Sequence, residues 1–104
     1  SWGGTVSLLA NTRLGLPAVS YYGSRSVPFL GEPLRAPMLF HFGEHDPVIT
    51  PADIDAHRAA HPDAPVHVYP AGHGFNSELR ADYHPDAARL AHRRTMEFLG
   101  CVLP

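Results

Sequence analysis

Three short apolar runs along the chain predict three β-strands. They cover residues 18–23, 38–43 and 65–70, are rich in branched or aromatic side chains, and end in glycine or proline. The run at 38–43, with the sequence MLFHFG, is apolar at nearly every position, which is typical of a strand buried on both faces. Residues 24–37 are spaced by prolines and predict a loop.

Three other segments have their apolar side chains at helical spacing. The first covers residues 5–14 and ends before a proline, which cannot continue the helical hydrogen-bond ladder. The second covers about 51–61, with Thr50 as its N-cap and a proline at its first position. The third covers 84–100, and Gly100 is a stop signal.

Helices that separate strands imply crossover connections, and crossovers imply a parallel sheet with helices on its faces. The fold class that we expect is therefore α/β. In such sheets, ligands and reactive groups gather beyond the carboxyl ends of the strands. The chain has no internal repeat and no linker, so it forms one domain or part of one.

The amino-acid composition limits the classes of partner that we expect for this protein. The 104 residues are 44% hydrophobic and 17% charged, with a formal net charge of -2, which is ordinary for a globular protein. All the basic residues are arginines without a run or stripe, which argues against nucleic acid as a partner. No apolar stretch reaches about 18 residues, so no membrane span is expected. The single cysteine, Cys101, makes no internal disulfide, and we expect a cytoplasmic protein.

Two loops at the carboxyl ends of the predicted strands hold residues suited to acid–base chemistry. Asp46 follows the second strand and His73 follows the third, so both lie at one edge of a parallel sheet. Ser1 precedes a glycine-bearing turn into the first helix, where a nucleophile can sit beside backbone N–H groups. The chain order nucleophile, acid, histidine is that of α/β-hydrolases.

Three blocks with these intervals, AVSYYG, PMLFHFGEHDPVITP and VYPAGHGFN, resemble the C-terminal half of the dienelactone hydrolases. These enzymes, also called carboxymethylenebutenolidases, have the α/β-hydrolase fold. The resemblance spans residues 1–76, and the last predicted helix fits the family's closing helix. It implies that residues 1–104 are the C-terminal half of a single α/β-hydrolase domain whose N-terminal half is absent from the chain.

The resemblance also implies roles for individual residues. Asp46 matches the acid of a catalytic triad, His73 its general base, and Ser1 the nucleophile position of a Gly-x-Cys-x-Gly-Gly elbow. The Trp2 backbone N–H would then contribute to the oxyanion site. Apart from the resemblance, Phe75 and Tyr22 are candidates to line the substrate pocket, and the alternative is core packing, which is more frequent for aromatic residues at strand ends. The substrate would be a small ester or lactone, with no cofactor and no metal.

The chain departs from the family pattern at two places. Ser1 stands where the family usually has cysteine, and it is either a native serine or a replacement for cysteine. The family holds its carboxylate-bearing lactone with arginines, one of them shortly after the catalytic histidine. Here the nearest arginine after His73 is Arg80. A sheet without the N-terminal half would also leave an edge exposed, so we expect the missing half or another chain to cover it.

Other interpretations remain open. His73 and Asp46 could be turn residues, and the chain could be a non-catalytic scaffold that keeps the fold. The α-amino group of Ser1 could act as its own base. A metal site at His41 and His45 is disfavoured, because that spacing needs a helix and the segment reads as a strand entering a turn.

Overall fold

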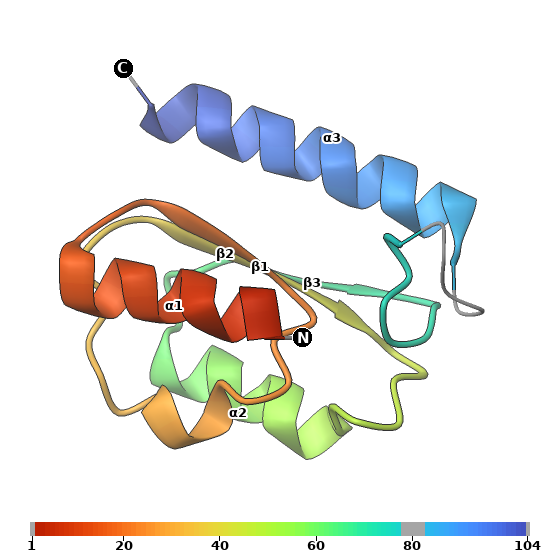
Figure 1. The fold of residues 1–104 in the computed structure, drawn as a ribbon, viewed down its shortest axis with the longest axis horizontal. Helices are drawn as coiled ribbons and strands as arrows, with labels where there is room; N and C mark the ends of the chain where they lie inside the picture. The colour runs from red at the N-terminus through yellow and green to blue at the C-terminus, as the bar shows by residue number, and fades with distance from the viewer. Residues whose placement is uncertain (1, 78–82, 104) are drawn as a thin grey trace.

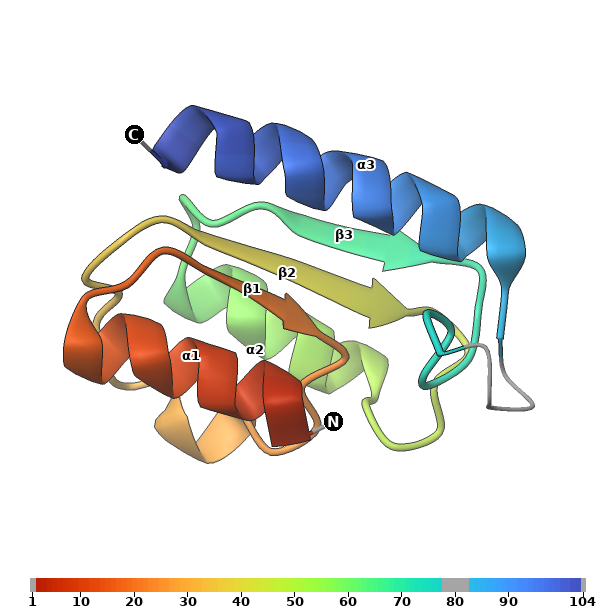
Figure 2. The same ribbon diagram turned by 45° about the horizontal axis from the view of Figure 1, so that its top comes forward.

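Three parallel strands form the sheet of this protein. The computed structural model describes residues 2–77 and 83–103. The strands are β1 (Ala18–Tyr21), β2 (Met38–Gly43) and β3 (Val66–Tyr69) (Figure 1). They lie in the order β1-β2-β3, with β2 in the centre (Figure 2). The prediction of a parallel α/β sheet is confirmed.

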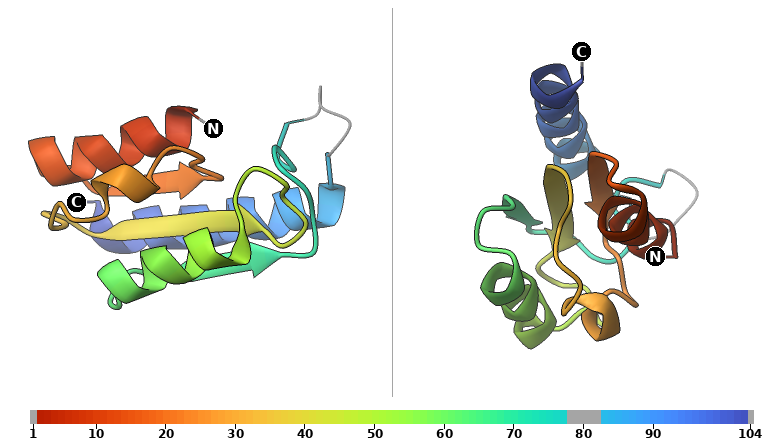
Figure 3. Two further views of the ribbon diagram at one scale, coloured as in Figure 1. Left: turned by 90° about the horizontal axis from the view of Figure 1, so that it is seen from below. Right: turned by 90° about the vertical axis from the view of Figure 1, so that its left-hand side faces the viewer.

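Helices cover both faces of this sheet. Helices α1 (Trp2–Leu14) and α2 (Pro51–Ala60) lie on one face, and α3 (Pro85–Val102) lies on the other (Figure 3). This three-layer arrangement confirms the predicted sheet with flanking helices. Because successive side chains of a strand point to opposite faces, the side chains of β2 are covered by helices on both sides of the sheet.

The core consists of two clusters, one on each face. On the side of α1 and α2, Phe40 and Phe42 of β2 pack with Leu8, Ile49 and Ile54. Under α3 lies a second cluster, made of Tyr69, Ala71, Phe75, Ala87 and Ala91. The sheet is therefore packed on both faces, and the ends of its strands are held in fixed positions.

Helix α1 begins earlier than the sequence predicts. It starts at Trp2 rather than Thr5, so Gly3 and Gly4 lie in its first turn instead of before it. A Cβ atom at Gly4 would come within 2.7 Å of the Tyr21 carbonyl oxygen. The glycine thus serves the close approach of the helix to the end of β1, and it does not delay the helix start.

One prediction about the connections is confirmed and another was wrong. Residues 24–37, predicted to be a loop, contain no α-helix and only the short 3₁₀ helix η1 (Val27–Phe29). The predicted end of the last helix at Gly100 was wrong. Helix α3 passes through Gly100 and is capped at Leu103, whose N–H donates to the Leu99 carbonyl. Gly100 is exposed, and its Cβ position has no atom within 4 Å. No close contact therefore requires a glycine at this position.

The start of α2 matches the prediction. The Thr50 side chain accepts from the Asp53 N–H at 3.2 Å, and the Asp53 carboxylate accepts from the Thr50 N–H at 3.1 Å. This reciprocal pair satisfies two N–H groups that the helix itself leaves unbonded. It also ends the loop that carries Asp46 at a defined point.

Candidate active site

The loops that follow β2 and β3 pack against each other, backbone on backbone. A Cβ atom at Gly43 would overlap the Ala71 carbonyl oxygen and come within 2.7 Å of the Gly72 carbonyl oxygen. The Glu44 N–H donates to the Tyr69 carbonyl at 2.7 Å, and the His45 N–H donates to the Ala71 carbonyl at 3.0 Å. Glycine at position 43 therefore permits the two loops to meet.

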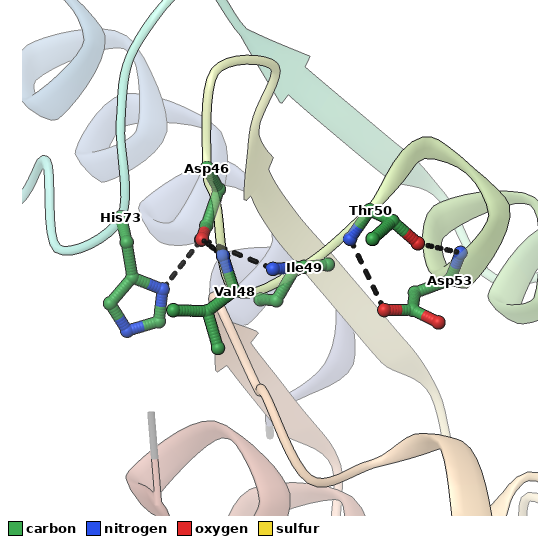
Figure 4. Close-up of polar contacts among 6 residues, drawn as sticks. All are labelled: Asp46, Val48, Ile49, Thr50, Asp53 and His73. Atoms are coloured by element: carbon green, nitrogen blue, oxygen red, sulfur yellow. Dashed lines mark hydrogen bonds and ion pairs between the residues drawn. The ribbon is translucent and has the colours of Figure 1, made fainter.

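Asp46 and His73, from these two loops, are hydrogen-bonded. His73 Nδ1 lies 2.5 Å from Asp46 Oδ2, as Figure 4 shows. The Asp46 side chain is fully buried and the His73 side chain is 9% exposed. Such a short contact between groups shielded from water is typical of a charge-assisted hydrogen bond.

The second oxygen of Asp46 binds its own loop. Asp46 Oδ1 accepts from the Val48 N–H at 2.7 Å and from the Ile49 N–H at 3.1 Å (Figure 4). A carboxylate has no proton to give, so His73 Nδ1 must be the donor in the contact with Oδ2. In a neutral imidazole, Nε2 is then left with a lone pair that can accept a proton.

The chain turns immediately after His73. Gly74 has a φ of +72°, a left-handed conformation that glycine adopts without steric penalty. Phe75 then inserts into the cluster under α3 and is fully buried. The imidazole is thus held between a glycine turn and an anchored aromatic ring.

The two predicted pocket residues occupy different environments. Phe75 packs with Tyr69 at 5.2 Å between ring centroids and is shielded from solvent. Tyr22 is half-buried, and its ring centroid lies 5.1 Å from that of His73. Of the two, Tyr22 therefore lies directly against the candidate site, and Phe75 lies one layer below it.

The amino-terminal end of α1 lies at the same edge of the sheet as the strand ends (Figure 2). Ser1 lies outside the described residues. Trp2 is the first residue of the helix and is 61% exposed, with the Arg25 guanidinium 4.6 Å from its ring centroid. The first N–H groups of a helix have no partner within it, so they can donate to groups outside the helix.

A second polar cluster lies on the α3 face, and the sequence analysis missed it. His41 Nδ1 is 2.8 Å from the Tyr69 hydroxyl, and His41 Nε2 is 2.9 Å from Thr95 Oγ1. Thr95 Oγ1 is also 3.0 Å from the Tyr21 hydroxyl. The sequence feature that could have indicated this cluster is the presence of polar side chains on one face of the predicted strands, at His41, His67 and Tyr69.

His41 is fully buried, and burial lowers its pKa to about 3, with nearby His67 and Arg94 acting in the same direction. Both of its nitrogens take part in hydrogen bonds within this network, whereas His45 is exposed. The two histidines of the rejected metal motif therefore lie in different environments. In residues 2–77 and 83–103, no group of three or more potential metal ligands is assembled.

The fold and the position of this pair define the class of the protein. A parallel sheet covered on both faces, with an acid and a histidine paired at the carboxyl ends of its strands, is the arrangement that α/β-hydrolases have in this part of their fold. The structure matches a crystal structure titled "Putative Dienelactone Hydrolase" from Klebsiella pneumoniae subsp. pneumoniae, with a TM-score of 0.83 and 26% identity. The match covers 95% of this chain and 48% of the other.

The sequence comparison identifies the family. The model of the dienelactone hydrolase family matches residues 1–103, and the chain belongs to this family. A Yersinia pestis protein described as "Putative carboxymethylenebutenolidase" is 33% identical over 93% of this chain and 43% of its own length. The carboxymethylenebutenolidase of Pseudomonas sp. strain P51 is 32% identical over 68% of this chain and 31% of its own length. The chain thus spans less than half the length of these relatives.

Within the described residues, no helix combines the length and apolar character that crossing a membrane would need.

Proposed function

We propose that the protein carrying this chain hydrolyses small carboxylic esters or lactones. The observation that carries the proposal is the buried 2.5 Å contact between His73 Nδ1 and Asp46 Oδ2, at the strand ends of a dienelactone hydrolase family fold. A carboxylate that fixes one imidazole nitrogen prepares the other to accept a proton. That arrangement serves acyl transfer through a nucleophile at Ser1, the residue that precedes α1 in the sequence.

In the proposed reaction, His73 Nε2 accepts the proton of the Ser1 hydroxyl as the oxygen attacks the carbonyl carbon. The Trp2 N–H donates to the oxyanion of the tetrahedral intermediate. His73 then returns the proton to the leaving oxygen, and the acyl group stays on Ser1. Water, deprotonated by the same imidazole, releases the carboxylic acid and restores the hydroxyl. Throughout, Asp46 stabilises the imidazolium that forms.

We further propose that residues 1–104 are the C-terminal half of one α/β-hydrolase domain. Within residues 2–77 and 83–103, strand β1 pairs with β2 alone, which leaves its other edge without a strand from this part of the chain. On α1, Trp2, Val6 and Leu14 are 61%, 58% and 70% exposed, although all three are apolar. An N-terminal half, in the same chain or another, would extend the sheet at β1 and cover this surface.

The site of action that we propose is the cytoplasm, and the substrate a small molecule bound at the strand ends. A chain with one cysteine, Cys101, makes no internal disulfide and gains nothing from an oxidising compartment.

The test is hydrolysis of p-nitrophenyl acetate and of simple enol lactones by the complete protein that contains this chain. We expect His73→Ala to lower kcat by roughly 100-fold or more, because general acid–base catalysis contributes at least that much. His67→Ala is the matched control, since His67 lies on the α3 face of the sheet beside His41. Equal activity of the His73→Ala variant and the unaltered protein would refute the proposed role of His73. No activity in the unaltered protein would leave a non-catalytic scaffold as the better account.

A further inference from the structure

Tyr22 has an unusual backbone conformation at the end of β1. Its φ is +40°, and it is the one non-glycine residue with a positive φ among residues 2–77 and 83–103. A bulky side chain rarely adopts this region, because its Cβ atom approaches the following carbonyl oxygen. Strained conformations of this kind persist only where surrounding contacts enforce them, and they gather at functional sites.

Two sets of contacts hold Tyr22 in place. Its N–H donates to the His41 carbonyl at 2.7 Å, which continues the pairing of β1 and β2 by one residue. Its ring meets the rings of Tyr21 and Phe75 edge-on, with centroids 6.0 and 5.5 Å away. The backbone is therefore anchored to β2 and the ring to the cluster under α3.

The strained backbone changes the direction of the side chain. Consecutive residues of an extended strand point to opposite faces, so the rings of Tyr21 and Tyr22 would then be separated by the sheet. With φ at +40° they touch instead, and the Tyr22 ring lies 5.1 Å from His73 at an interplanar angle of 59°. The conformation thus brings the ring to the imidazole.

This contact complements the hydrogen bond to Asp46. The bond to Oδ2 holds Nδ1 of His73, and a ring contact acts on a different part of the imidazole, its plane. The Tyr22 ring lies against the imidazole and restricts the tilt of that plane. An aromatic ring within about 6 Å also favours a positive charge, which His73 acquires when it takes the proton.

We propose that Tyr22 is a positioning residue for His73, acting through its aromatic ring. This proposal rests on the proposed function, because it assigns Tyr22 a part in the work of the same imidazole. In this proposal, the strained backbone of Tyr22 places its ring against His73, and the ring orients Nε2 of His73 toward the nucleophile.

Three variants of the complete protein test this role. Tyr22→Phe keeps the ring, and we expect kcat for p-nitrophenyl acetate to stay within about twofold of the original value. Tyr22→Gly and Tyr22→Ala remove the ring, and we expect kcat to fall by about tenfold or more with a smaller change in KM, because misdirected catalytic groups lower kcat. Tyr22→Gly should melt at a higher temperature than Tyr22→Ala, since glycine accepts the positive φ.

Phe29→Ala is the control for general destabilisation. Phe29 is a half-buried ring of η1 that packs beneath Arg13 at the carboxyl end of α1. Its removal should lower the melting temperature without lowering kcat measured well below that temperature. An equal loss of kcat in Phe29→Ala and Tyr22→Gly would overturn the positioning role.

Two other results would also overturn it. A Tyr22→Phe variant as impaired as Tyr22→Gly would make the hydroxyl the active group, and a rise in KM with unchanged kcat would make Tyr22 a substrate contact only. Failure of the proposed function looks different, because the His73→Ala variant would then retain full activity. Loss of activity in His73→Ala beside full activity in Tyr22→Gly would refute the role of Tyr22 alone.

Discussion

Asp46 serves two structural purposes with its two carboxylate oxygens. Oδ1 closes the turn by accepting from Val48 and Ile49, and Oδ2 accepts from His73. The interpretation of Asp46 as a turn former and its interpretation as the partner of a histidine are therefore compatible. The turn is the device that immobilises the carboxylate, and a fixed carboxylate in turn orients the imidazole.

The Asp46→Asn variant separates these purposes. The asparagine carbonyl can still accept from the Val48 and Ile49 N–H groups, so we expect little change in melting temperature. Its NH₂ group must donate to His73 Nδ1, which moves the histidine proton to Nε2 and removes the acceptor. Initial-rate assays should show kcat reduced on the order of 10³–10⁴-fold, as expected for the wrong tautomer.

Asp55→Asn provides the matched control, since Asp55 is an exposed residue of α2 whose side chain pairs only weakly, at 3.7 Å, with Arg58. Undiminished activity in the Asp46→Asn variant would show that the carboxylate does not set the tautomer.

At the residue scale, the sequence predicts those site residues whose position follows from the strand that they come directly after. Asp46 and His73 each follow a recognisable strand, so their convergence comes from the parallel sheet alone. The His41 network could not be predicted in this way, because Thr95 is 54 residues distant and lies on a helix whose rotation depends on packing. The strain at Tyr22 is likewise a product of tertiary contacts.

At the scale of elements, the site depends on how closely the loops after β2 and β3 approach. Gly43 lies at the end of β2, where a side chain would meet backbone carbonyl groups of Ala71 and Gly72. Backbone atoms cannot rotate away as a flexible side chain can. The closeness of the two loops is therefore maintained by the absence of one Cβ atom.

We expect Gly43→Ala to destabilise the protein by about 1–3 kcal/mol, as overpacking commonly does, and to lower kcat by separating Asp46 from His73. Urea unfolding and initial-rate assays measure the two effects. Gly31→Ala is the control, since its Cβ position has no atom within 4 Å. If Gly43→Ala unfolds at the same urea concentration as Gly31→Ala, the close approach of the loops is not required.

Element boundaries were predictable where capping chemistry is local. The start of α2 follows from Thr50 and Asp53, which bond to each other's backbone across one turn. The start of α1 could not be predicted from local residues. Gly4 lies inside the helix because the helix packs closely against the end of β1 and against Gly23. A glycine in the sequence can indicate either the end of a helix or a close contact with another element. The three-dimensional structure is needed to distinguish these two cases.

At the scale of the whole molecule, α3 is attached to the sheet through a polar network as well as an apolar cluster. His41, Tyr69, Thr95 and Tyr21 are linked by hydrogen bonds, and the Arg94 guanidinium lies 5.4 Å from the Tyr69 ring centroid. His41 stays neutral there, since burial lowers its pKa to about 3. The parallel sheet between helical layers could be predicted from sequence, but this attachment could not.

This network predicts acid sensitivity. In the unfolded chain, His41 takes a proton near its ordinary pKa of 6.5, whereas the folded protein resists protonation down to about pH 3. The unfolded state therefore binds more protons in this window, and the free energy of unfolding falls as pH drops below 6.5, by up to about 1.4 kcal/mol per pH unit from His41. Burial also lowers the pKa of His57, His61 and His67, in the same direction.

Urea unfolding at pH 7 and pH 5 measures this dependence. The His41→Gln variant carries an amide that does not titrate, so its stability should change less between these two pH values than that of the original protein. Identical pH dependence in the two proteins would mean that His41 is not the group responsible.

The most direct test of the central claim is to label the complete protein with a fluorophosphonate and to locate the adduct by peptide mass spectrometry. Fluorophosphonates react covalently with the activated serine of serine hydrolases. We predict that the label is found on Ser1 and that the rate of labelling collapses in His73→Ala but persists in His67→Ala. A label on another residue, or labelling of the His73→Ala variant at the original rate, would contradict the proposal that Asp46 and His73 activate a nucleophile at the start of α1.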